Sequence, residues 1–167
     1  MSDEVTIRKW RKEDAAALAV VANNKKIWLN VRDRFPYPYS ITNAVEWIAF
    51  ALKYSPAQNL AITYKGHVAG SVGVLVKEDV YRKSIEIGYF IGEAYWGKGV
   101  ATKAVQLLLE YISVHFQVIR IYAEVFEHNR ASMRVLEKNG FTLESIRKKS
   151  VVKNQVLMDD YVWVKLV

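Results

Sequence analysis

A glycine-spaced cationic segment that runs directly into an amphipathic helix is the feature that most constrains this sequence. Residues 92–112 read GEAYWGKGVATKAVQLLLEYI and follow an apolar, strand-like segment, SIEIGYFIG. A helix that begins after such a loop directs free backbone N–H groups and the positive end of its dipole toward an anion. Glycine lets the anion approach the backbone closely because it carries no Cβ. The segment therefore predicts a binding site for a phosphate-bearing ligand.

The composition is that of an ordinary soluble globular protein. The chain has 167 residues, which fits a single domain over residues 1–167 with a buried core. Hydrophobic residues make up 51%, yet no apolar run reaches the roughly 20 residues of a membrane span. The N-terminal segment MSDEVTIRKW has no signal-peptide core, and the lack of cysteine excludes disulfides and thiolate metal sites. We expect a cytoplasmic protein that binds no membrane.

The net charge of +7 favours an anionic partner, but the distribution of charge argues against a nucleic-acid surface. The basic residues occur as scattered pairs and triplets, without a basic tail. The three histidines, His67, His115 and His128, are too far apart in sequence for metal-ligand spacing. We therefore expect neither a nucleic-acid partner nor a bound metal ion.

The hydrophobic periodicity predicts a mixed α/β fold, with helices packed against a mixed sheet. Strands are predicted at residues 5–10, 59–65, 67–76, 84–92, 119–126, 141–149 and 158–167. Helices are predicted from an Asp14 N-cap to about residue 23, and at 42–54, 98–115 and 130–140. Their expected buried stripes are Val45, Ile48, Ala49 and Leu52 in the second helix, and Val100, Ala104, Leu107, Leu108 and Tyr111 in the third. Two prolines make residues 31–40 an extended aromatic loop.

Two nucleotide-binding motifs fit the glycine loop poorly. A P-loop would match Gly92, Gly97 and Lys98, but Gly99 then stands where a serine or threonine should bind magnesium. A dinucleotide fingerprint would match Gly97 and Gly99, but Thr102 then occupies the third glycine position, which packs the helix against the strand. The residues therefore disfavour both an ATPase and a dehydrogenase.

Residues 84–141 resemble the acetyl-CoA-binding half of the GNAT N-acetyltransferases. The family loop, Gln/Arg-x-x-Gly-x-Gly/Ala, corresponds to the segment WGKGVA at 96–101, with Trp96 in place of the usual Gln or Arg. A second family segment, Asn-x-x-Ser followed by Gly-Phe, matches Asn129, Ser132, Gly140 and Phe141. The surrounding sequence resembles the branch of the ribosomal-protein N-terminal (alanine) acetyltransferases, and weaker similarity covers nearly the whole chain.

The resemblance implies the GNAT fold, a mostly antiparallel twisted sheet flanked by about four helices, with one splayed strand pair that holds acetyl-CoA as co-substrate. It implies direct transfer of acetyl from the thioester to a primary amine. A backbone N–H near Tyr89 would polarise the thioester carbonyl, and backbone groups near Ile91 would pair with pantetheine. The contacts with acetyl-CoA implied by the resemblance involve Tyr89, Ile91, Trp96, Gly97, Lys98, Gly99, Val100, Ala101, Thr102, Asn129 and Ser132.

Two residues are candidates for proton transfer. Glu86 is the candidate base because it lies on the strand that would carry the thioester, although a surface ion pair with a lysine explains it equally well. Many relatives place a tyrosine seven residues after the motif asparagine, but that position is Leu136 here. Ser132 is the alternative proton donor, unless it only binds the cofactor or caps the local turn.

The residues leave the amine acceptor open. The branch resemblance favours a protein N-terminal amine, whereas an amino acid, a polyamine or an aminoglycoside is the alternative. The aromatic residues Phe35, Tyr37 and Tyr39 either wall the acceptor pocket or anchor their loop. A non-catalytic acyl-CoA-binding module is a further alternative, and homodimer formation, common in the family, is left undecided by the sequence.

Overall fold

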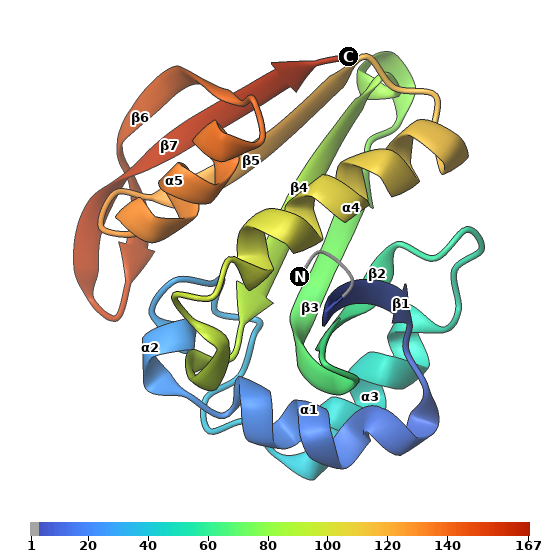
Figure 1. Cartoon of the computed structure of the whole chain (residues 1–167). Coiled ribbons are helices and arrows are strands. Elements are labelled where there is room, and N and C mark those ends of the chain that lie inside the picture. The colour runs from blue at the N-terminus through green and yellow to red at the C-terminus, as the bar shows by residue number, and fades with distance from the viewer. Residues whose placement is uncertain (1–3) are drawn as a thin grey trace.

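A seven-stranded mixed sheet forms the centre of the structure, a computed structural model in which residues 4–167 are described (Figure 1). The strand order is β1-β2-β3-β4-β5-β7-β6, and all neighbours are antiparallel except β4 and β5. The strands are β1 Val5–Lys9, β2 Asn59–Tyr64, β3 His67–Val76, β4 Ser84–Ile91, β5 Arg120–Phe126, β6 Thr142–Lys153 and β7 Val156–Leu166. The predicted mixed, mostly antiparallel sheet is thus confirmed.

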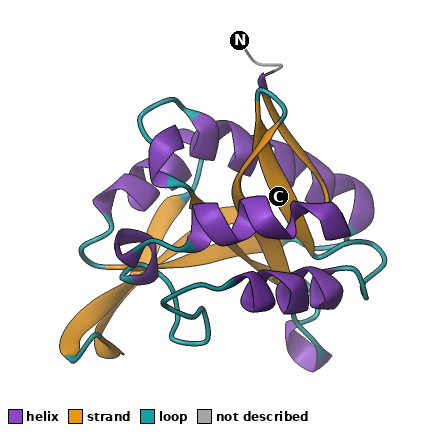
Figure 2. Cartoon of the chain, turned by 90° about the horizontal axis from the view of Figure 1, so that it is seen from below, coloured by secondary structure: helices purple, strands orange, loops and turns teal. Residues whose placement is uncertain are grey.

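Five α-helices and three short 3₁₀ turns connect the strands within the described residues. The helices are α1 Ala15–Ala22, α2 Lys25–Trp28, α3 Ile41–Ala51, α4 Val100–His115 and α5 Arg130–Lys138, and the 3₁₀ turns are η2 Lys12–Asp14, η3 Asp79–Tyr81 and η4 Glu93–Tyr95. No helix formed by residues 4–167 has both the length and the apolarity that crossing a membrane requires. The β6–β7 hairpin projects at the left of the molecule in both views (Figure 1, Figure 2).

Two hydrophobic clusters cover opposite faces of the sheet. Leu60 and Ile62 of β2 belong to the cluster that includes α4 and α5, whereas Ala61 belongs to the cluster that includes α1 and α3. Successive strand residues point to opposite faces, so the two helix pairs lie on opposite sides. On β4, Ile85 and Ile87 face α4 and α5 in the same way.

The parallel strands β4 and β5 pair at one end only. Their register covers residues 84–86 against residues 120–122, after which β4 continues to Ile91 and β5 to Phe126 without pairing to each other. The two strands visibly diverge from their paired end (Figure 1). The predicted splayed strand pair is therefore present, and residues 87–91 of β4 keep one backbone edge free of β5.

The first predicted helix begins where expected, directly after Asp14 at the N-cap position of α1, but it is not capped as expected. Asp14 does not cap α1 with its side chain, because it lies at the end of η2. Its carboxylate instead accepts the backbone N–H of Arg11 at 2.8 Å and both guanidinium nitrogens of Arg8 at 2.8 and 2.9 Å. The short α2 was not predicted at all, since a four-residue helix carries too little periodicity to detect.

The predicted buried stripe of α3 was correct at Ile48 and wrong at its other three residues. The structure buries Ala44, Ile48 and Ala51, whereas Val45 and Leu52 are about half exposed. Apolar residues occur on several sides of this helix, and α3 packs against α1, where alanines permit close approach of the two backbones. The buried face of α4 also differs slightly from the predicted one. Residues 105 and 112 are buried, whereas residues 107 and 111 are only partly buried.

Candidate active site

The glycine loop is built from two residues in the left-handed region. Gly97 has φ +72° and Gly99 has φ +74°, conformations that side chains with a Cβ rarely adopt. A Cβ at either position would meet no atom within 4 Å, so the space in front of the loop is open. Gly99 is the N-cap of α4, and no side chain of the described residues caps this end. The first-turn N–H groups of a 16-residue helix are therefore available to an anion.

Trp96 ties the loop to the end of β4. Its indole Nε1 donates a hydrogen bond to the carbonyl oxygen of Ile91 at 2.7 Å. The residue that departs from the family pattern thus has a structural contact of its own, inside the site. Lys98 is exposed, and its Nζ lies 5.8 Å from the centre of the Tyr64 ring.

A pair of hydroxyl groups links β4 to α5. Tyr89 of β4 places its hydroxyl 2.8 Å from the Oγ of Ser132 in α5 and donates to the Ser132 carbonyl at 3.2 Å. The Asn129 side chain accepts the Ser132 N–H at 3.3 Å and so caps α5. Burial raises the pKa of Tyr89, so this phenol keeps its proton at neutral pH. Sequence reasoning gave Tyr89 only a backbone role and missed this contact.

Five charged side chains meet on the opposite face of the sheet, and we call them the charged cluster. Its members are Arg32, Glu86, Glu124, Arg147 and Asp160. The Arg32 guanidinium lies 2.6 Å from Glu86 and 3.1 Å from Glu124. Arg147 lies 2.8 Å from Glu124 and 3.6 Å from Asp160. Two guanidinium groups are thus interleaved with three carboxylates.

Glu86 is the last residue of β4 that pairs with β5, and the two strands separate beyond it. It is buried, and its second carboxylate oxygen lies 3.4 Å from Lys77 Nζ. The structure therefore gives Glu86 the lysine partner that the sequence offered as an alternative, together with Arg32. Neither contact tests whether Glu86 takes part in proton transfer, so that role stays a prediction.

Sequence reasoning missed Arg32, Glu124, Arg147 and Asp160 as parts of one site. They come from a loop and three strands, and 92 positions separate Arg32 from Glu124. The one local signal is a charged residue inside an apolar strand, as Glu124 is in IRIYAEVF. That signal alone does not identify the partners of the carboxylate.

A small cavity of about 210 Å³ opens beside the charged cluster. It is lined by Arg32, Asp33, Glu124, Phe126, Ser150, Val151, Val152, Lys153 and Asp160. Lys153 is almost completely buried, with its Nζ 2.9 Å from Asp33 and 3.9 Å from the centre of the Trp28 ring. These contacts join the β6–β7 hairpin to α2 and to the loop that carries Arg32.

Asp160 is the most unusual residue of this cavity. It is 3% exposed, and its Oδ1 has no hydrogen-bond partner among residues 4–167. Burial, together with the neighbouring charge of Glu124, raises the pKa of Asp160 from 3.8 to about 6. The guanidinium groups of Arg147 and Arg32 lower the pKa of Asp160 and so limit this rise.

The aromatic loop is mainly anchored rather than free. Phe35 packs 5.1 Å from Tyr39 and 5.2 Å from Phe90, measured between ring centres, and burial raises the pKa of Tyr39 to about 12. Tyr37 is exposed and lies 6.1 Å from Trp28. Anchoring therefore explains Phe35 and Tyr39, whereas Tyr37 remains on the surface.

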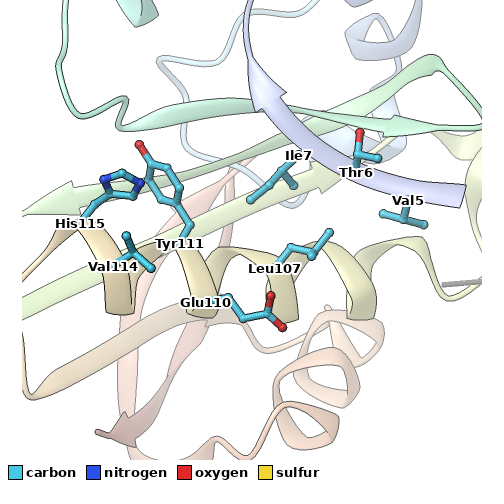
Figure 3. A pocket seen from close by; sticks show the side chains of 8 residues that line it. All are labelled: Val5, Thr6, Ile7, Leu107, Glu110, Tyr111, Val114 and His115. Atoms are coloured by element: carbon cyan, nitrogen blue, oxygen red, sulfur yellow. The ribbon is translucent and has the colours of Figure 1, made fainter. Parts of the chain in front are cut away.

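A larger, mostly apolar pocket of about 390 Å³ lies between β1 and α4 (Figure 3). It is lined by Val5, Thr6, Ile7, Leu107, Glu110, Tyr111, Val114 and His115. None of the predicted site residues contributes to it. In the described part of the chain, no group of three or more His, Cys, Asp or Glu side chains is arranged to hold a metal ion.

The sequence is similar to those of known acetyltransferases. A family model described as "Acetyltransferase (GNAT) domain" matches residues 4–142. The probable N-acetyltransferase YjcK of Bacillus subtilis is 46% identical over 76 residues, which are 46% of this chain and 42% of YjcK. The putative ribosomal N-acetyltransferase YdaF of the same organism is 26% identical over 162 residues, covering 92% of this chain and 86% of YdaF.

Two solved structures superpose over almost the whole chain. The microcin C7 self-immunity acetyltransferase MccE, in complex with acetyl-CoA and AMP, has a TM-score of 0.85 and 25% identity, covering 99% of this chain and 93% of that chain. RimL, a ribosomal L7/L12 alpha-N-protein acetyltransferase in complex with coenzyme A, has a TM-score of 0.85 and 21% identity, covering 98% and 95%. The RimL likeness is one of fold alone.

Proposed function

This chain belongs to the GNAT acetyltransferase family and is an acetyl-CoA-dependent N-acetyltransferase, and we propose that its acceptor is the N-terminal amine of a protein. The observation that carries the proposal is the size of the cavity at the charged cluster. At about 210 Å³ it is smaller than the roughly 300–1,000 Å³ of pockets that enclose a whole small molecule. A site of this size suits the end of a longer chain, whose remainder stays outside.

The position of β6 supports a peptide acceptor. β6 is the last strand in the sheet order, and its residues 150–153 line the cavity. An edge strand can pair with an extended peptide through main-chain hydrogen bonds. The name of YdaF, a putative ribosomal N-acetyltransferase, points in the same direction.

The cofactor contacts of the proposal follow the two motifs. Backbone amides of residues 97–102 would bind the pyrophosphate, with Lys98 adding positive charge and Trp96 holding the loop to β4. The free edge of β4 near Ile91 would pair with pantetheine. Asn129, which already orders the start of α5, would contact the cofactor arm.

The chemistry of the proposal divides between the two faces of the sheet. A backbone N–H near Tyr89 would stabilise negative charge that develops on the thioester oxygen. Ser132 would supply a proton to the departing sulfur, and the neighbouring Tyr89 hydroxyl, 2.8 Å away, would orient it. Glu86, which lies where the strands part, is the sequence-based candidate for the proton acceptor.

A small-molecule acceptor is the second candidate function. It is favoured by the similarity to MccE, a self-immunity acetyltransferase whose structure contains AMP beside acetyl-CoA. In this case the acceptor would extend from the cavity along the α2–α3 loop. The two candidates therefore differ in what lies outside the cavity.

An acceptor screen tests the proposal. The protein is incubated with acetyl-CoA and peptides that begin with alanine or serine, and acetylation is followed by mass spectrometry. The same peptides with a blocked N-terminus and an internal lysine are the matched control, and amino acids, spermidine and an aminoglycoside complete the panel. We expect the highest kcat/KM for the free N-termini. Equal turnover of blocked peptides, or faster turnover of a small amine, contradicts the proposal.

A further inference from the structure

We propose that the cavity at the charged cluster binds the acceptor as an ammonium group and that Asp160 Oδ1 is the atom that accepts its proton. The inference rests on the proposed function only in requiring an amine acceptor, and it holds for a peptide or a small amine. It assigns to a β7 residue the role for which the sequence suggested Glu86.

The hydrogen bonds of the charged cluster single out Asp160. One oxygen of Glu86 accepts from Arg32 and the other lies near Lys77, while the two oxygens of Glu124 accept from Arg32 and Arg147. Asp160 has only a 3.6 Å contact between its Oδ2 and Arg147, and its Oδ1 has no partner in the described chain. A buried carboxylate oxygen without a donor is costly, and an ammonium group supplies up to three donors.

The cavity lies on the face of the sheet that faces away from α4 and α5. On β5, Ile121, Ala123 and Val125 pack against these helices, so the alternate residue Glu124 points to the other face. Asp160 pairs in register with Phe126, the last residue of β5. Asp160 therefore lies where β4 and β5 are no longer paired, on the face of the sheet opposite to α5.

Gly88 leaves open space at β4, on the face of the strand that carries Glu86. It lies between Glu86 and Phe90 on β4, and a Cβ at Gly88 would meet no atom within 4 Å. An amine could therefore approach the strand gap from the face of the charged cluster. Ser132 and the Tyr89 hydroxyl lie on the α5 side, so proton acceptor and proton donor occupy opposite sides of the reacting carbon.

The acidity of Asp160 suits proton acceptance near neutral pH. The charged groups that face it are Arg32 from the α2–α3 loop, Glu86 from β4, Glu124 from β5 and Arg147 from β6. With a pKa of about 6, Asp160 is ionised at pH 7 and is a stronger base than an ordinary aspartate. Asp160 first takes one proton from the ammonium group and leaves a neutral amine, whose electron pair forms the C–N bond as the C–S bond breaks. The second nitrogen proton is released to solvent, and Asp160 gives up its own proton to solvent afterwards. The electron pair of the C–S bond leaves with sulfur, which takes a proton from the Ser132 side.

Steady-state kinetics of Asp160→Asn test the inference, with Asp159→Asn as the matched control. Asp159 is the adjacent residue on β7, and its carboxylate instead accepts from Lys148 and the Lys149 backbone. We expect Asp160→Asn to lower kcat/KM for the amine by about 100-fold or more, with unchanged affinity for acetyl-CoA. We expect Asp159→Asn to stay within about twofold of the parent protein.

The pH profile separates proton acceptance from a merely structural role. In the parent protein, kcat/KM should fall below about pH 6 as Asp160 becomes protonated. In Asp160→Asn the fall in kcat/KM should instead occur below the pKa of the amine itself, about 8 for an α-amino group, because only the neutral amine then reacts. Activity of Asp160→Asn within about threefold and an unmoved profile overturn the inference. The inference is also overturned if Glu86→Gln, and not Asp160→Asn, shows both the loss of kcat/KM and the moved pH profile.

A measurement without turnover keeps the inference separate from the proposed function. If the screen finds no amine substrate, the proposed function fails, and the carboxyl carbons of ¹³C-aspartate-labelled protein are observed by NMR with CoA bound. The Asp160 resonance, assigned by its loss in Asp160→Asn, should titrate near pH 6 and shift on addition of ethylammonium chloride. A resonance that does not respond to ethylammonium overturns the inference.

Discussion

At the scale of single residues, Asp160 weakens the folded state at neutral pH. Its pKa is about 6 in the folded protein against 3.8 ordinarily, so between these pH values the folded state holds a proton that the unfolded state has released. The free energy of unfolding therefore falls as pH rises from about 4 to about 6, and the deficit persists above that. Such a destabilising residue is typical of a functional site.

Asp160→Asn should consequently stabilise the protein. We expect the free energy of unfolding to rise by up to about 3 kcal/mol at pH 7.5, because a pKa shift of one unit corresponds to about 1.4 kcal/mol. At pH 4 the gain should nearly vanish, since the aspartate is then protonated in the folded state. Denaturant unfolding at both pH values measures this.

Asp159→Asn is the control with the opposite sign. The Lys149 backbone N–H and the Lys148 ammonium lower the pKa of Asp159, so its carboxylate favours the folded state above its ordinary pKa. Its replacement should not stabilise the protein at pH 7.5. If both variants gain stability equally, a general effect of reducing negative charge explains the result, and the unfavourable burial of Asp160 does not.

At the scale of elements, the turn from η4 into α4 should be sensitive to any added Cβ. We expect Gly99→Ala to weaken acetyl-CoA binding at least tenfold, because the new methyl group stands where the pyrophosphate is proposed to bind. The left-handed φ also costs about 1–2 kcal/mol of stability. Isothermal titration calorimetry gives the affinity, and thermal unfolding gives the stability.

Gly66→Ala provides a matched control for backbone strain. Gly66 lies in the β2–β3 turn with φ +81°, and a Cβ there also meets no atom within 4 Å. Both variants should lose similar stability, but only Gly99→Ala should lose affinity for acetyl-CoA. Equal affinities in the two variants would remove the glycine loop from the cofactor site.

Most elements could be predicted because their signals are local. The β2–β3 hairpin follows from Lys65-Gly66, both at positive φ, and the end of α5 follows from Gly140 at φ +82°. The buried face of α3 could not be predicted, because the choice among its apolar residues depends on how closely α1 approaches. The side chain of Asp14 was misassigned because Arg8 and the Arg11 backbone compete for it.

At the scale of the whole molecule, the sheet has two parts, β1 to β4 and β5 to β7. Only three residue pairs between β4 and β5 join them, because these two strands diverge. A ligand that binds between these strands contacts both parts and binds only the folded state. Acetyl-CoA at a hundred times its Kd should therefore raise the free energy of unfolding by about 2.7 kcal/mol. Thermal unfolding with acetyl-CoA, ATP and NAD at equal concentration measures the effect.

The three ligands distinguish a specific site from general anion binding. ATP and NAD also carry phosphates, so comparable shifts with all three would indicate that the basic surface, at net charge +7, binds phosphate without selectivity. No shift with acetyl-CoA would contradict the placement of its pyrophosphate on α4. We expect a clear shift with acetyl-CoA alone.

The sequence by itself determined the glycine loop, the order of the strands and of the longer helices, and the two motifs that carry the family resemblance. These features depend on backbone conformation and periodicity within short segments, so neighbouring residues suffice to specify them. Only the tertiary structure decided which charged groups meet. β7 inserts between β5 and β6, and this order brings Asp160 beside Glu124 and Arg147, while the α2–α3 loop contributes Arg32. Contacts between such distant segments depend on sheet topology, and no local pattern encodes that.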